Sequence, residues 1–180
     1  GKVAYVTSGS SSVYPFGINL SGAQLTASSQ TVSTGTNTYP RGVVYHPSGK
    51  YVYVVLYGNG SSNGYVQAYT SVTTSGAESL TALGSSVSTS GVGPSNMAVD
   101  ATGRYAYVLN TLSGSVAMYK ICQYATSADA CTPGALTALS PATITVEASN
   151  VQPVSIAADD ASVYIVANGK VYQLSLIHIS

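Results

Sequence analysis

Residues 93–110 have the sequence GPSNMAVDATGRYAYVLN, and this stretch sets the organisation of the whole chain. It predicts a strand, a tight turn over Asp100–Gly103 and a second strand, because apolar runs flank a turn that ends in glycine. Related stretches occur at residues 39–55 (YPRGVVYHPSGKYVYVV) and 152–166 (QPVSIAADDASVYIV), and a remnant occurs at residues 2–8 (KVAYVTS). A repeat of about 50 residues that consists only of strands is typical of a propeller blade rather than of a helical solenoid.

Composition places the chain among strand-rich proteins that carry little charge. Charged residues make up 7% of the 180 residues, against roughly 25% in an average soluble domain. Lys plus Arg and Asp plus Glu both number 6, so we expect no nucleic-acid partner. The apolar fraction of 45% is sufficient for a packed core, and no apolar run reaches the ~18 residues of a membrane span. The 15 Tyr and the many Val favour strands, and solubility must come from Ser, Thr, Asn and Gly, as is common in secreted and periplasmic proteins.

The strand and turn signals predict four blades of unequal completeness. The expected boundaries are about residues 1–36, 37–91, 92–148 and 149–174, with about 14 strands and no helix. The first blade lacks its opening strand and the last blade lacks its outer strand. We therefore expect an all-β fold, an incomplete β-propeller of about three and a half four-stranded antiparallel blades. Such an array leaves open edges, so we expect it to be part of a larger ring.

Both ends of the chain predict a fragment. The sequence begins at Gly1, already inside a strand, without Met or a signal peptide. Residues 175–180 (SLIHIS) depart from the repeat and resemble translated sequencing-adapter sequence. We therefore exclude this tail, with His178, from the expected propeller of residues 1–174.

Several short motifs resemble those of a known family. Residues 107–110 (YVLN) resemble the Tyr-Val-Thr-Asn repeat core, and residues 5–8 (YVTS) differ from it by one letter. Residues 134–137 (GALT) precede an outer strand, and a Pro-x-x-(x)-Ala-Val-Asp-x-x-Gly pattern precedes the second strand. On these motifs residues 2–174 resemble the lactonase-like seven-bladed propellers, which include propeller-type 6-phosphogluconolactonases and many extracytoplasmic proteins. The matching positions are structural, so the resemblance assigns no catalytic residue to this chain.

Two cysteines, Cys122 and Cys131, lie in the loop between the third and fourth strands of one predicted blade. One interpretation is metal or redox chemistry, but a zinc site needs further paired Cys or His residues nearby, and the sequence offers none. The other interpretation is a disulfide that staples a long loop. We favour the disulfide, which indicates an oxidising compartment and hence a periplasmic or secreted protein. We expect no metal and no cofactor.

Titratable residues give few candidates for catalysis. His46 occupies, in its own turn, the place that Asp100 has in the next blade and Asp159 in the last, so a turn residue bonded to its own backbone is favoured over a general base. The sequence shows no nucleophile signature. Four further acidic residues have no recognisable partner for general acid–base chemistry. They are Asp100, Glu78, Asp129 and Glu147.

Propeller geometry ranks the surfaces. The connections between blades lead into the innermost strands and rim the central channel, where propellers usually bind ligands. The only cation expected at this rim is Arg41. One interpretation is that its guanidinium holds a carboxylate or phosphate in a bidentate contact. The other is that Arg41 is a solvated loop arginine without a ligand. The polar residues that we expect at the rim are Arg41, Asn96, Asn110, Glu147 and Asn150.

Two functions remain open at this point. The first is an extracytoplasmic binding or scaffold module whose ligand is a small molecule, a sugar or a protein. The alternative is a lactone hydrolase, similar to 6-phosphogluconolactonase, whose catalytic groups lie largely outside this fragment. A hydrolase would need a water-activating His or carboxylate and a cation near the channel mouth. In either case we expect the remaining blades of the parent chain as partners.

Overall fold

A computed structural model describes residues 2–28, 30–74, 77–124, 130–146 and 152–175. Within these residues all regular secondary structure is β-strand, so no helix long and apolar enough to cross a membrane occurs there. Cys122 lies near the end of a strand, whereas Glu147, Asn150 and His178 fall outside the described residues. The strands are β1 (Lys2–Ser8), β2 (Ser12–Asn19), β3 (Gln24–Ala27), β4 (Val32–Ser33), β5 (Pro40–Tyr45), β6 (Tyr51–Leu56), β7 (Asn63–Thr74), β8 (Ala77–Ala82), β9 (Val87–Val92), β10 (Pro94–Val99), β11 (Tyr105–Asn110), β12 (Ser115–Ile121), β13 (Leu136–Thr145), β14 (Pro153–Ala158), β15 (Ser162–Ala167) and β16 (Lys170–Ser175).

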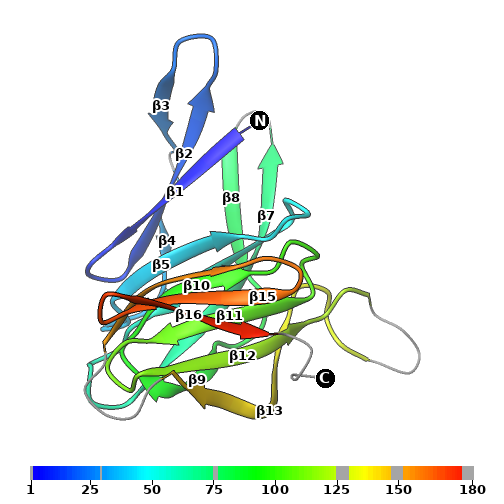
Figure 1. The fold of residues 1–180 in the computed structure, drawn as a ribbon. Helices are drawn as coiled ribbons and strands as arrows, with labels where there is room; N and C mark the ends of the chain where they lie inside the picture. The colour runs from blue at the N-terminus through cyan, green and yellow to red at the C-terminus, as the bar shows by residue number, and fades with distance from the viewer. Residues whose placement is uncertain (1, 29, 75–76, 125–129, 147–151, 176–180) are drawn as a thin grey trace.

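The strands form four antiparallel sheets that follow one another along the chain (Figure 1). Sheet 1 contains β1–β4, sheet 2 contains β5–β9, sheet 3 contains β10–β13 and sheet 4 contains β14–β16. In sheets 2 and 3 four consecutive strands pair in chain order. This arrangement confirms the prediction of an all-β fold made of four-stranded antiparallel units, consistent with part of a β-propeller.

The outer strand of each of the first three sheets pairs with its neighbour in two separate halves. In sheet 3 the first half of β13 pairs with the end of β12 and the second half with its beginning, with a register shift between them. In sheet 2 the same halves are two strands, β8 on the far part of β7 and β9 on its beginning, and in sheet 1 they are β3 and β4 on β2. This division explains why the described residues form sixteen strands where the sequence predicts about 14.

The sheets pack face to face in chain order, and the apolar runs in β6 and β11 serve both of their faces. Successive side chains of a strand point to opposite faces, so a strand between two sheets must be apolar throughout. Tyr53 and Val55 pack toward sheet 3, in one core cluster, while Val52 and Val54 pack toward sheet 1 in another. A third cluster joins sheets 3 and 4. All of β6 beyond Tyr51 is buried, as its unbroken apolar sequence predicts.

In each of the three repeats, a polar side chain in the first turn accepts hydrogen bonds from nearby backbone N–H groups. His46 is buried, and its Nδ1 accepts a hydrogen bond from the Ser48 backbone N–H at 3.0 Å. Its Nε2 therefore carries the proton and donates to Gly103 O at 2.9 Å, which links the turns of sheets 2 and 3. Asp100 accepts from the two backbone N–H groups that directly follow its turn, at 2.8 and 2.9 Å. Asp159 accepts from two backbone N–H groups just after it, at 2.8 and 2.7 Å. These contacts are the turn role that the sequence favours for all three residues.

Cys122 and Cys131 form a disulfide with a Cα–Cα distance of 6.0 Å, as expected from their spacing. The loop that they close starts where β12 ends, and the Cys122 backbone bonds to Ala135 O and Gly134 N, both at 2.9 Å. Gly134 O also accepts a hydrogen bond from the buried hydroxyl of Tyr53 at 2.9 Å. The segment that follows the disulfide is thus tied to sheet 2 as well as to its own sheet.

Reduction of this disulfide should lower the free energy of unfolding by about 2–3 kcal/mol, because the loop that it closes is short and most of its stabilisation comes from restricting the unfolded chain. Urea unfolding with and without reductant measures the effect. The double variant Cys122→Ala with Cys131→Ala is the control, since reductant should leave its midpoint unchanged. Intact mass should rise by two hydrogens on reduction, and an unchanged mass would contradict the disulfide.

Candidate functional site

Two of the predicted rim residues lie on adjacent inner strands. Arg41 is on β5 and exposed, and Asn96 is on β10 and half-buried. The strands come so close that a Cβ on Gly42 would lie 3.1 Å from Ser95 O and 3.4 Å from Asn96 Cα. Both strands have a register shift at this point, between Pro40 and Val43 and between Pro94 and Asn96. The Asn96 Oδ1 accepts from the Met97 backbone N–H at 2.8 Å, which fixes that side chain.

Asn110, the third predicted rim residue within the described part of the chain, has no exposed surface. Its Nδ2 donates to Thr89 O and to Ser115 Oγ, both at 3.2 Å, while its Oδ1 has no hydrogen-bond partner among the described residues. Thr89 belongs to sheet 2 and Ser115 to sheet 3. Asn110 is therefore placed as a tie between two sheets and not beside Arg41 on the surface.

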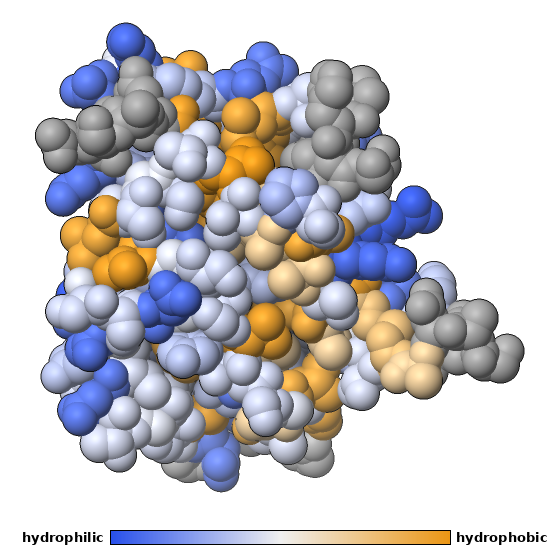
Figure 2. All heavy atoms as spheres, turned by 90° about the horizontal axis from the view of Figure 1, so that it is seen from below, coloured by the Kyte–Doolittle hydropathy of each residue, from blue (hydrophilic) through white to orange (hydrophobic). Residues whose placement is uncertain are grey.

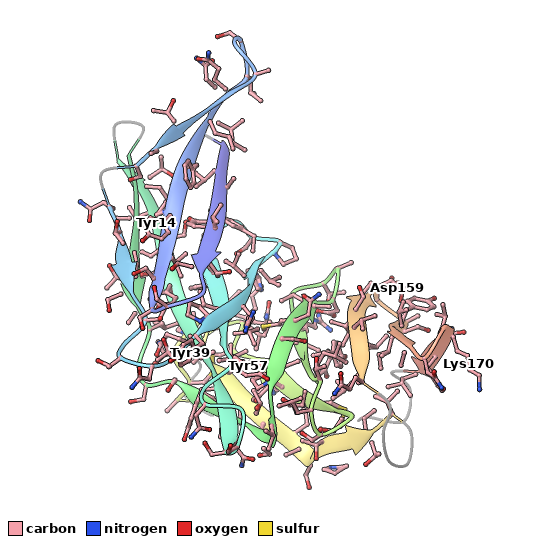
Figure 3. All side chains as sticks on the ribbon, turned by 90° about the vertical axis from the view of Figure 1, so that its left-hand side faces the viewer. Tyr14, Tyr39, Tyr57, Asp159 and Lys170 are labelled. Atoms are coloured by element: carbon pink, nitrogen blue, oxygen red, sulfur yellow. A yellow bond between two sulfur atoms is a disulfide. The ribbon has the colours of Figure 1, made fainter. Side chains whose placement is uncertain are left out.

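Arg41 borders a hollow of about 310 Å³ at the beginning of β5. The other residues that line it are Tyr39, Tyr57, Gly58 and Asn59. The Arg41 guanidinium carbon lies 5.1 Å from the centre of the Tyr57 ring, within the range of a cation–π contact. Figure 3 shows Tyr39 and Tyr57 close together at this end of the strands. A cation held by an aromatic face is thus presented to an open hollow.

The backbone around the hollow is held in an unusual conformation. Tyr39 has a φ of 47°, in the left-handed region that bulky residues rarely enter. Its N–H donates to Ser10 O at 3.2 Å, and its carbonyl accepts from the Tyr57 N–H at 3.2 Å, so neighbouring segments impose this geometry. Strained positions of this kind cluster at binding sites, where the surrounding structure stabilises them.

The chemistry of the hollow suits recognition of an anion. A guanidinium offers paired donors to a carboxylate or phosphate. The Asn59 Oδ1 is occupied by the backbone N–H groups of Ser61 and Ser62, at 2.9 and 3.0 Å, which turns its amide into a further available donor. Tyr39 and Tyr57 add aromatic surface. Among these lining residues none is a carboxylate, a histidine or a cysteine.

Sequence reasoning identified Arg41 but missed Tyr39, Tyr57 and Asn59. Tyr57 directly follows the apolar run of β6, and Tyr39 directly precedes Pro40, so both read as strand ends. The three residues come from two loops, which are paired by backbone hydrogen bonds from Tyr57 N–H to Tyr39 O and from Gly58 N–H to Thr38 O. No spacing in the sequence carries that information.

A second hollow, of about 330 Å³, lies beside the disulfide. It also offers basic groups, from Arg104 and Lys120, and its wall includes Gln123, whose amide is engaged by Gly103 O and Ile121 O at 2.7 and 3.2 Å. Within the described part of the chain, no group of three His, Cys, Asp or Glu residues is arranged to hold a metal ion. The hollow at Arg41 combines a cation–π contact with a strained backbone.

Glu78 forms a separate polar cluster between sheets 1 and 2. It is only 2% exposed, and its carboxylate accepts hydrogen bonds from Tyr5 Oη at 2.9 Å, from Thr73 Oγ1 at 2.5 Å and from Ser71 Oγ. Tyr45 joins the cluster, since its ring stacks on that of Tyr5 at 5.7 Å and its hydroxyl bonds to Ser71 Oγ at 2.9 Å. Sequence reasoning found no partner for Glu78 because its three partners are all hydroxyls and all lie on other strands.

The cluster keeps Glu78 ionised and Tyr5 neutral. Burial alone would raise the pKa of Glu78, but the hydrogen bonds from Ser71, Thr73 and Tyr5 together outweigh burial and lower that pKa below its usual range. Burial is the main cause that raises the pKa of Tyr5 far above its usual range, and the Glu78 carboxylate raises it further. A buried carboxylate that accepts hydrogen bonds from several hydroxyl groups, with no basic side chain among these donors, strongly stabilises the contact between the two sheets.

Comparisons with known proteins were made at three levels. No family model matches the sequence, and no curated protein matches it either. Among solved structures, a protein from Lactobacillus plantarum matches with a TM-score of 0.67 and 17% identity over 95% of this chain and 49% of its own. A candidate 6-phosphogluconolactonase from Bacteroides fragilis matches with a TM-score of 0.67 and 16% identity, over 95% of this chain and 46% of its own. A gluconolactonase from Xanthomonas campestris matches with a TM-score of 0.50 and 16% identity, over 91% of this chain and 44% of its own.

The described sheets form part of a β-propeller. At these low identities the likeness establishes the fold alone. The chain spans about half the length of the structures that it matches. The propeller's surface suits the low charge of the sequence: the face in Figure 2 is mostly weakly polar, with separate apolar patches.

Proposed function

We propose that this chain is an extracytoplasmic binding module of the lactonase-like propeller class, which takes a ligand with a carboxylate or phosphate group at Arg41. The observation that carries the proposal is the Arg41 guanidinium, 5.1 Å from the Tyr57 ring centre, at the border of a hollow of about 310 Å³. The position of Arg41 next to the inner strand β10 agrees with the preference of propellers for ligands near their innermost strands. The bidentate reach of guanidinium favours a planar oxyanion over a neutral ligand.

The extracytoplasmic location is supported by two properties of the chain. The disulfide between Cys122 and Cys131 is of the kind that persists in oxidising compartments. The charged fraction of 7% leaves solubility to uncharged polar residues. Both properties fit a periplasmic or secreted protein.

A lactone hydrolase is the alternative function. Two of the compared proteins are described as lactonases, and Arg41 would supply the cation that such an enzyme needs. The residues that line the hollow supply no His or carboxylate to activate water. Binding is therefore the function that this site supports best, and the remaining blades of a longer protein are where we would look for a base.

The Arg41→Ala variant should bind an anionic sugar acid about 10- to 100-fold more weakly than the unchanged protein, because a charge-assisted bidentate contact is worth roughly 1.5–3 kcal/mol. Isothermal titration with gluconate and with 6-phosphogluconate measures the effect. Arg41→Lys should fall between the two, since it keeps the charge and loses the fork. Arg104→Ala removes an exposed arginine at the other hollow and is the matched control. Equal affinities for the Arg41 and Arg104 variants would contradict the proposal, and ring opening of the corresponding lactone would favour the hydrolase.

A further inference from the structure

The chain contains three Asn-Gly pairs, at residues 59–60, 63–64 and 168–169. In such a pair the glycine nitrogen is able to attack the Asn Cγ, because glycine places no side chain in the way and the attack closes a succinimide ring within the chain. The attack requires the Asn backbone to rotate until that nitrogen faces Cγ. The sequence makes the three pairs equal, so their surroundings decide which of them reacts.

Two of the pairs are held in hydrogen-bonded strand structure. Asn63 is the first residue of β7 and pairs with β9, and Gly64 is buried, since a Cβ on it would lie 2.2 Å from Pro94 Cγ. Asn168 and Gly169 form the two-residue turn between β15 and β16, with φ values of 49° and 70°. Rotation of either Asn backbone first requires a strand pair to open locally, which costs free energy.

The pair of Asn59 and Gly60 differs in its backbone and in its hydrogen bonds. Asn59 is exposed and lies outside the strands, and no described residue accepts a hydrogen bond from the Gly60 N–H. The Asn59 Oδ1 accepts from the N–H groups of Ser61 and Ser62, at 2.9 and 3.0 Å, and from Ser62 Oγ at 3.0 Å. These donors polarise the Cγ–Oδ1 bond and stabilise the oxyanion that forms when a nitrogen attacks Cγ. No described residue donates to the Oδ1 of the other two pairs.

Asn19 provides a further comparison, because it has the donors without the glycine. Its Oδ1 accepts from the Ser21 N–H at 3.0 Å and from Ser21 Oγ at 2.7 Å. The next residue is Leu20, whose side chain hinders the approach of its nitrogen to Cγ. Among the described Asn-Gly pairs, residues 59–60 therefore combine a backbone outside the strands with donors already placed on Oδ1.

We propose that Asn59 is a site of spontaneous deamidation, and that the carboxylate formed there weakens anion binding at Arg41. The Gly60 nitrogen attacks Asn59 Cγ, so that a new N–Cγ bond forms and the Cγ–Nδ2 bond breaks. Nδ2 leaves as ammonia, with the proton that the Gly60 nitrogen gives up. Water then opens the succinimide at one of its two carbonyl carbons and yields aspartate or isoaspartate, whose carboxyl proton passes to solvent. Water is the only co-reactant.

The effect on binding rests on the proposed function of the Arg41 hollow. Asn59 lines this hollow together with Arg41, and no lining residue is a carboxylate. Deamidation replaces the amide donor of Asn59 with a negative charge, which repels an anionic ligand and attracts the Arg41 guanidinium. Isoaspartate also lengthens the backbone next to Gly60, where a Cβ would lie 3.3 Å from Tyr57 Cε1. Tyr57 is the ring that contacts Arg41, so either product should disturb the site.

Peptide mapping of the aged protein identifies the reactive site without any ligand. The folded 180-residue chain is kept in mildly alkaline heavy-oxygen water, which labels only the deamidation that occurs during incubation, and its chymotryptic peptides are sequenced by mass spectrometry. Asn59 should take up label at least about tenfold faster than Asn63 and Asn168, because those two need local opening. Asn19 should stay unlabelled. In urea the three Asn-Gly pairs should react at similar rates. Label at Asn63 or Asn168 that equals or exceeds label at Asn59 in the folded chain would overturn the proposal.

Titration with gluconate and with 6-phosphogluconate tests the effect on binding. Asn59→Asp reproduces the charge of the aspartate product and should bind these anions about tenfold more weakly than the unchanged protein, since two like charges then share one hollow. Asn168→Asp adds the same charge in the turn before Lys170, which Figure 3 shows well away from Tyr57, and should leave the affinity unchanged. Circular dichroism records that both variants are folded.

The two measurements separate failure of this inference from failure of the proposed function. Equal affinities for Asn59→Asp and Asn168→Asp, with binding by the unchanged protein intact, would overturn the link between deamidation and Arg41. Absence of binding by the unchanged protein would refute the proposed function and this link with it. The peptide map decides in every case whether Asn59 is the site that deamidates.

Discussion

The Glu78→Gln variant should lose about 2–4 kcal/mol of its free energy of unfolding at pH 7. Glu78 is almost fully buried, and its carboxylate accepts from the hydroxyls of Tyr5, Ser71 and Thr73. An amide offers one oxygen in place of two and brings an NH₂ group that faces hydroxyls already oriented to donate. At least one buried hydroxyl then lacks its acceptor. Because Tyr5 is in sheet 1 and Ser71 and Thr73 are in sheet 2, the loss should loosen the contact between these sheets first.

Urea unfolding measures the Glu78 effect, and Asp160→Asn is the matched control. That substitution also removes one carboxylate charge, but at an exposed position, so it should change the free energy by less than about 0.5 kcal/mol. Hydrogen exchange of β1 should accelerate in the Glu78 variant more than exchange of β11. Equal losses in the two variants would mean that Glu78 acts only through net charge.

The pH dependence gives an independent check on the same cluster. The pKa of Glu78 is lower in the folded protein than its ordinary value of 4.5. The ionised carboxylate therefore contributes its full share to the free energy of unfolding above pH 4.5, and this share is lost as the pH falls through the folded pKa. The difference in stability between the unchanged protein and Glu78→Gln should therefore shrink on acidification. The pKa of Asp159 is also lowered, chiefly by the backbone N–H groups of Ala161 and Ser162. Since Asp159 is present in both proteins, its effect cancels in the difference.

The repeat explains why so much of the fold can be predicted from the sequence. Apolar runs such as Tyr51–Leu56 and the glycine-ended turn at Asp100–Gly103 are local signals, and a period of about 50 residues multiplies each of them. The outer strands are the exception. Their two halves are set by register shifts against the third strand, as between Ala117 and Tyr119, and a register shift depends on two strands at once.

The candidate site is less predictable for a related reason. Arg41 can be selected from the sequence because it is a cation in a connection between blades that leads into an inner strand, and Cys122 and Cys131 because of their spacing. The remaining wall of the hollow depends on loop-to-loop contacts, and the left-handed conformation of Tyr39 has no local cause, since tyrosine disfavours it. The sequence therefore predicts which residues are chemically capable of binding, and only the fold decides which of them meet.

Asn110→Asp should destabilise the protein more than any other substitution proposed for this chain, by about 3–5 kcal/mol at pH 7. Asn110 has no exposed surface, and both of its hydrogen bonds run from Nδ2, to Thr89 O and Ser115 Oγ at 3.2 Å. A carboxylate there would face the Thr89 carbonyl with a like partial charge. The space is also fixed, because a Cβ on Gly91 would lie 2.3 Å from Nδ2, so the side chain cannot withdraw toward β9.

The sign of the pH dependence separates this cause from a simple packing defect. Burial without a basic partner must raise the pKa of the introduced carboxyl above its unfolded value of about 3.9. The free energy of unfolding of the variant should therefore be closest to that of the unchanged protein at acid pH. The difference between the two should grow as the pH rises through the raised pKa. Asn19→Asp is the matched control, since Asn19 is exposed and its Oδ1 already accepts from the Ser21 N–H at 3.0 Å, which a carboxylate does equally well. A pH-independent loss at position 110 would point to altered shape alone, whereas a loss that grows with pH identifies Asn110 as the neutral, buried tie between sheets 2 and 3.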